Sequence, residues 1–166
     1  MDYNLKEQIF EIFEAGVINY CVIDILKGSR YRLSDFIESK SFFEDILPRV
    51  VKENPQEDYL RNLVNPENIS VEDFKILSRE GVYDYVKKYF QPFIECNKDI
   101  DVPKLFGRFS DLTSDTLEAY ILDKKWFTMN DIRINEREYM CFDDYLLILW
   151  FNKSRTQLFS LTIYND

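Results

Sequence analysis

The stretch that decides the fold is DYLLILWFNKSRTQLFSLTIYND, residues 144–166. A short polar segment, NKSR at 152–155, separates an apolar run from a run in which apolar and polar residues alternate. Alternation with a period of two is typical of a half-buried strand, whereas an unbroken apolar run fits a central strand buried on both faces. The stretch therefore predicts a β-hairpin with strands at 145–151 and 156–164.

Upstream of this hairpin, residues 118–134 and 139–142 are aromatic and β-branched with turn formers between them, and they predict further strands. At the N-terminus, apolar residues of the 4–26 segment recur at helical spacing, which predicts a helix over its first half. The run VINYCVIDIL at 17–26 is β-branched, so a strand remains the alternative for the second half.

Several shorter patterns favour helices in the middle of the chain. Ser34 and Ser41 could each cap a short helix, and a further short helix is expected near 57–64. The sequence SVED at 70–73 resembles a capping box and predicts a helix through 79, broken or bent at Gly81 and followed by an apolar helical stripe up to Pro92.

These patterns predict one α+β domain over residues 1–166. Its helical N-terminal two-thirds would pack on a small antiparallel sheet formed mainly by the C-terminal third. No repeat, low-complexity tract or linker indicates a second domain.

The composition excludes most catalytic templates. The chain has no histidine and four glycines, and neither glycine-rich nucleotide-binding motif occurs. Three cysteines in no C-x-x-C pair indicate buried, reduced thiols rather than a zinc site. The nuclease-like pattern [DE]-x-K occurs three times, against about two matches expected by chance. We therefore predict a non-enzyme that uses no cofactor and no metal.

The charge indicates which partners are favoured. A net charge of −9 repels nucleic-acid phosphates and anionic membranes, and it attracts a basic protein. No signal peptide or apolar stretch of membrane-spanning length is found, so a cytoplasmic location is expected. The oligomeric state is left open.

Five residues are candidates for contact with such a partner: Asp143, Asp144, Glu136, Glu138 and Trp126. Adjacent acids point to opposite faces of a strand, so the Asp143–Asp144 pair indicates a turn before the strand or an acidic tip that meets a basic surface. Glu136 and Glu138 would extend this tip. Trp126 is either a core anchor or an exposed aromatic that contributes strongly to binding.

In size, acidity and its aromatic C-terminal hairpin at 144–166, the chain resembles the immunity proteins of bacterial polymorphic-toxin and contact-dependent inhibition systems. The resemblance implies an antidote that neutralises a cognate toxin, often a basic nuclease, by occlusion and without catalysis. Three alternatives remain: a phage-type inhibitor of a host defence protein, a scaffold module, and a metal-dependent hydrolase or nuclease with a carboxylate-only site.

Overall fold

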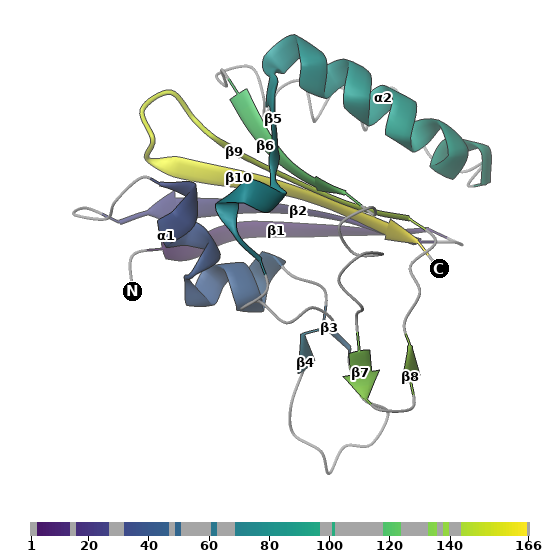
Figure 1. Cartoon of the computed structure of the whole chain (residues 1–166), viewed down its shortest axis with the longest axis horizontal. Coiled ribbons are helices and arrows are strands. Elements are labelled where there is room, and N and C mark those ends of the chain that lie inside the picture. The colour runs from purple at the N-terminus through teal and green to yellow at the C-terminus, as the bar shows by residue number, and fades with distance from the viewer. Residues whose placement is uncertain are drawn as a thin grey trace.

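The structure, a computed structural model, describes residues 3–13, 16–26, 32–46, 49–50, 61–62, 69–96, 101, 118–123, 133–135, 138–139 and 144–165. Its main feature is a six-stranded sheet in the order β1-β2-β10-β9-β6-β5, in which all neighbours are antiparallel (Figure 1). The strands of this sheet are β1 (Tyr3–Phe13), β2 (Gly16–Ile25), β5 (Lys75–Ser78), β6 (Glu118–Asp123), β9 (Asp144–Phe151) and β10 (Gln157–Asn165).

Helical segments and two small sheets complete the described part of the chain. The helical segments are α1 (Leu33–Ile37), the π-helical turn η1 (Phe42–Ile46), the 3-10 turn η3 (Val71–Asp73) and the long helix α2 (Arg79–Cys96). Short strands pair as β3 (Arg49–Val50) with β4 (Arg61–Asn62), and as β7 (Arg133–Asn135) with β8 (Glu138–Tyr139).

The predicted C-terminal hairpin is confirmed, and it forms the centre of the sheet. Strand β9 lies between β10 and β6, and its residues 146–150 are fully buried. Trp150 stacks on Phe159 of β10 with a ring-centroid distance of 5.7 Å. The unbroken apolar run therefore has the physical cause that the sequence indicated, which is burial on both faces of the sheet.

Helices cover both faces of the sheet, and each face has its own apolar cluster (Figure 1). On the face that α1 covers, called the α1 face, Phe36 makes edge-to-face contacts with Tyr3 and Phe42 at centroid distances of 5.1 and 5.6 Å. On the opposite α2 face, Val82 and Val86 of α2 are buried against Trp150 and its neighbours. Aromatic pairs of this kind contribute about 0.5–1.5 kcal/mol beyond burial.

The predicted N-terminal helix is wrong, because residues 3–13 and 16–25 form the antiparallel pair β1 and β2. The strand alternative for the second half is confirmed. A register shift between Leu5 and Glu7 leaves one extra residue in β1, which is how a β-bulge moves later side chains to the opposite face. Leu5 then packs on the α1 face and Ile9 on the α2 face. Their spacing of four residues imitates a helix.

Three further predictions need correction. The capping box at Ser70 is present, but the chain turns once through η3 and then enters strand β5 instead of a helix. Helix α2 begins at Arg79 and continues through both Gly81 and Pro92. Of the helix expected near 57–64, the described residues Arg61 and Asn62 form strand β4.

The expected fold class is therefore wrong in its helical part. The structure is mostly a six-stranded antiparallel sheet, and among the described elements only α2 is a helix of seven or more residues. Strand β2 explains the error: Ile18 and Tyr20 are buried on one face, and Cys21, Ile23 and Ile25 on the other. A strand that is covered on both sides loses the alternation by which it would be recognised.

Candidate functional site

The described coordinates place only part of the predicted partner-binding set. Trp126, Glu136 and Asp143 lie outside the described residues. Glu138 begins β8, and Asp144 begins β9, where it pairs with Asn165. These two acids belong to different sheets, so no strand pairing brings them together.

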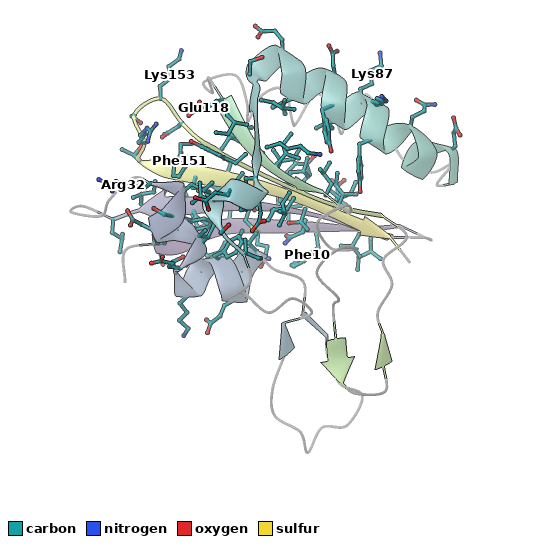
Figure 2. All side chains as sticks on the ribbon, viewed as in Figure 1. Phe10, Arg32, Lys87, Glu118, Phe151 and Lys153 are labelled. Carbon is teal, nitrogen blue, oxygen red and sulfur yellow. The ribbon has the colours of Figure 1, made fainter. Side chains whose placement is uncertain are left out.

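The described surface offers another candidate, at the edge strand β1. After the bulge, the side chains of Gln8, Phe10 and Ile12 follow one another along the α1 face, opposite Cys21, Asn19 and Val17 of β2. We call these three β1 residues the β1 stripe. Phe10 is 55% exposed and Ile12 is 79% exposed, although both are large and apolar. In Figure 2, Phe10 lies on the α1 side of the sheet, far from Lys153.

An acidic layer lies beside this stripe on the same face. It consists of residues 32–46 and 69–74, which contain α1, η1 and η3, and we call it the acidic cap. The first segment contains four carboxylates and the second contains two, and the basic side chains within them are Arg32 and Lys40. Lys40 is already bound to Glu44 at 3.2 Å, between two well-exposed side chains. The two segments therefore carry a net negative charge, and Glu38, Glu44 and Glu72 are its exposed carboxylates.

The cap and the stripe are joined at the end of η1. The Asp45 carbonyl accepts hydrogen bonds from Gln8 Nε2 at 3.3 Å and from Cys21 Sγ at 3.6 Å. Phe10 is the next β1 residue on that face beyond Gln8. On the other face of β1, Glu7 is exposed and Glu11 is partly exposed. The β1 stripe thus begins where the acidic cap ends. Two further carboxylates, those of Glu7 and Glu11, lie on the opposite face of the same strand.

β1 is also a sheet edge. In the described part of the chain it pairs only with β2, so one row of its backbone N–H and C=O groups faces away from the sheet. Such an edge accepts an added strand. An exposed aromatic on that strand supplies apolar area, and the nearby carboxylates supply charge complementarity.

Two groups of described side chains were candidates for chemistry, the acidic residues and Cys21. No group of three or more His, Cys, Asp or Glu side chains is placed to hold a metal ion among them. Burial raises the pKa of the Cys21 thiol to about 11, which keeps it neutral and poorly nucleophilic near pH 7. Of the [DE]-x-K matches, Asp73 accepts hydrogen bonds from Ser70 and serves as a helix cap.

Sequence reasoning missed Phe10 and Ile12 because it assigned the 4–13 segment to a helix. The available signal was the pair of residues itself: Phe10 and Ile12 are two apart, the spacing of one strand face. No protein-family model, curated protein or solved structure matches this chain. None of the helices that the structure describes is long and apolar enough to cross a membrane.

Proposed function

We propose that this chain is a non-catalytic acidic binding protein that neutralises a basic protein partner, such as a toxin, by occlusion, in the manner of an immunity protein or inhibitor. The supporting observation is the juxtaposition of the exposed β1 stripe with the acidic cap. Phe10 and Ile12 are two large exposed apolar side chains that follow one another on one face of an edge strand, and such an edge is prone to aggregate unless a partner covers it. A protein that must hold a partner gains a contact at that edge.

In the proposed mechanism, the two features act at different stages of binding. The carboxylates of the cap raise the rate of encounter with a basic surface and select against acidic partners. They also imitate nucleic-acid phosphates if the partner is a nuclease. Phe10 and Ile12 are then buried in the complex, and this step slows dissociation.

A basic partner is the occupant that the charge favours. A second copy of this chain would bring two charges of −9 together, and the like-charged Glu7 and Glu11 lie on the very strand that would pair. Like charges in close contact destabilise such an assembly. We therefore propose binding to a protein with a basic, partly apolar strand or loop, in the cytoplasm of the producing cell.

The experiment that tests this proposal is photo-crosslinking in the native host. A photo-reactive phenylalanine analogue is placed at Phe10 in one variant and at Ile76 in the matched control. Ile76 is 59% exposed on β5, the opposite edge strand of the same sheet. Position 10 is expected to capture one basic protein that position 76 does not. Equal capture at both positions, or capture of acidic proteins only, would contradict the proposal.

A further inference from the structure

A cleft lies at the turn between β9 and β10, in a different part of the sheet from Phe10 of the β1 stripe (Figure 2). It has a volume of about 190 Å³ and is lined by Glu118, Phe151, Asn152, Lys153 and Arg155. In Figure 2, Glu118, Phe151 and Lys153 gather at one end of the sheet, whereas Phe10 lies under its middle. Among the residues that the structure describes, the lining thus includes two cations, one carboxylate and one aromatic ring.

The size of the cleft limits its ligand. Drug-sized ligands occupy pockets of about 300–1,000 Å³, and a water takes about 30 Å³ of liquid volume. A volume of 190 Å³ therefore suits a molecule of about six to ten non-hydrogen atoms. The cleft is open to solvent on one side, so a larger molecule would place only a group of about this size in it.

Hydrogen bonds within the turn hold its conformation, so the cleft is already formed without a ligand. Asn152 Oδ1 accepts hydrogen bonds from the backbone N–H groups of Thr156 and Gln157, at 2.9 and 3.1 Å. Asn152 Nδ2 donates to Thr156 Oγ1 at 3.0 Å. Gln157 Nε2 in turn donates to Asp24 Oδ1 of β2 at 2.8 Å. These contacts fix the turn to two neighbouring strands.

Arg155 occupies a backbone position that suits another residue type. Its φ is 51°, in the left-handed region where glycine and asparagine are favoured. An arginine at this unfavourable backbone angle is explained if its guanidinium group has a role in the cleft. Its Cζ lies 5.7 Å from the centroid of the Phe151 ring, a cation–π distance that orients the group at the cleft.

The carboxylate on the other side of the cleft is positioned as well. The Tyr120 hydroxyl donates a hydrogen bond of 3.0 Å to Glu118 Oε1. Burial and the neighbouring Glu118 raise the pKa of Tyr120, so the hydroxyl keeps its proton and remains a donor. The Tyr120 ring meets Phe151 edge to face at 6.3 Å. A carboxylate can accept further hydrogen bonds at its remaining lone pairs.

We propose that this cleft binds a small free α-amino acid in its zwitterionic form. The ligand carboxylate lies against Lys153 and Arg155, the ammonium group lies against Glu118, and a short aliphatic side chain contacts the Phe151 ring. A simple anion fits less well, because Glu118 repels it. The site is independent of the proposed function, since it shares no residue with the β1 stripe or the acidic cap.

The test is a titration of the full-length, isotope-labelled protein with L-alanine, L-valine and L-leucine, monitored by amide NMR shifts. We expect saturable shifts at residues 118 and 151–157, with a dissociation constant of about 1 mM for the best of the three. Arg155→Gly, which suits the backbone angle, and Glu118→Gln should each weaken binding at least tenfold. Lys87→Gln, at an exposed position on α2, is the matched control and should leave binding unchanged.

Comparison ligands make the zwitterion requirement falsifiable. Acetate, inorganic phosphate, N-acetyl-L-valine and L-valinamide each lack one charge of the zwitterion and are expected to bind at least tenfold more weakly. Equal binding of any of them would overturn the proposal in favour of a simple ion site. The absence of saturable shifts with all three amino acids, in a protein whose spectrum shows it folded, would overturn it outright. Tighter binding by a peptide with a free C-terminus would do the same.

Discussion

Replacing Phe10 and Ile12 together by serine separates the role of the β1 stripe in binding from its role in folding. A Phe side chain carries about 150–250 Å² of surface, and 55% of Phe10 is exposed. About 80–140 Å² of its surface is then available to a partner, which corresponds to about 2–3.5 kcal/mol at ~25 cal/mol per Å². Loss of the Phe10 contact alone predicts a partner dissociation constant about 30- to 300-fold higher, and loss of Ile12, which is 79% exposed, raises it further.

Folding should suffer less than binding in the same variant. The buried share of Phe10 is the smaller one, and Ile12 is 79% exposed, so the free energy of unfolding is expected to fall by about 1.5–3 kcal/mol. Urea unfolding followed by the fluorescence of the two tryptophans, of which Trp150 is buried, measures this quantity, and biolayer interferometry against the crosslinked partner measures affinity. Ile76→Ser, on the opposite edge strand, is the control for loss of an exposed apolar side chain.

Two results would refute this reasoning. One is a change of less than threefold in affinity for the Phe10, Ile12 double variant. The other is an equal loss of affinity in Ile76→Ser, which would mean that exposed apolar area anywhere on the sheet has the same effect. Either result would remove the β1 stripe from the binding surface.

Three further predictions concern the fold. Trp150→Ala should lower the free energy of unfolding by about 3–5 kcal/mol, because Trp150 is fully buried and stacks on Phe159; a loss below 1 kcal/mol in urea unfolding would show that the central strand is misplaced. Cys21 should react with iodoacetamide at pH 8 only in denaturant. Its pKa is raised from 9.0 to about 11 in the folded state. The contribution of the buried thiol to the free energy of unfolding is therefore complete below pH 9 and is lost as the pH rises through 11. A Cys21→Ala variant should lack that part of the alkaline destabilisation, and an identical pH profile in both proteins would count against the buried thiol. Asp73→Ala removes the acceptor of the hydrogen bonds from the Ser70 N–H and Oγ–H groups and should lower the free energy of unfolding by about 0.5–2 kcal/mol. A thermal midpoint equal to that of the unmodified protein would contradict this prediction.

The sequence was sufficient for the hairpin at the centre of the sheet, because local rules govern it. The apolar run of β9, the short polar turn and the alternation in β10 act within one contiguous segment. Helix α2 was found in part for the same reason, since its buried residues Val82 and Val86 recur at helical spacing.

The N-terminal half was mispredicted because a bulge obscures the strand pattern of β1 and because its partner β2 is paired in turn with a strand far away in the sequence. Strand β2 pairs with β10, more than 130 residues later in the chain. Residues 16–25 alone do not indicate that partner. The bulge in β1 imitates helical spacing, and burial on both faces removes alternation from β2. The two-residue spacing of Phe10 and Ile12 was visible in the sequence, but their exposure follows from the register of β1 on β2, which the sequence alone did not show.

If carboxylates guide a basic partner onto this chain, the association rate must depend on the salt concentration. With the partner captured at Phe10, stopped-flow association is measured from about 0.05 to 0.5 M NaCl, where the screening length falls from about 14 to 4 Å. We predict that the association rate constant falls at least tenfold over this range while the dissociation rate changes little. An association rate that does not depend on salt would contradict the claim.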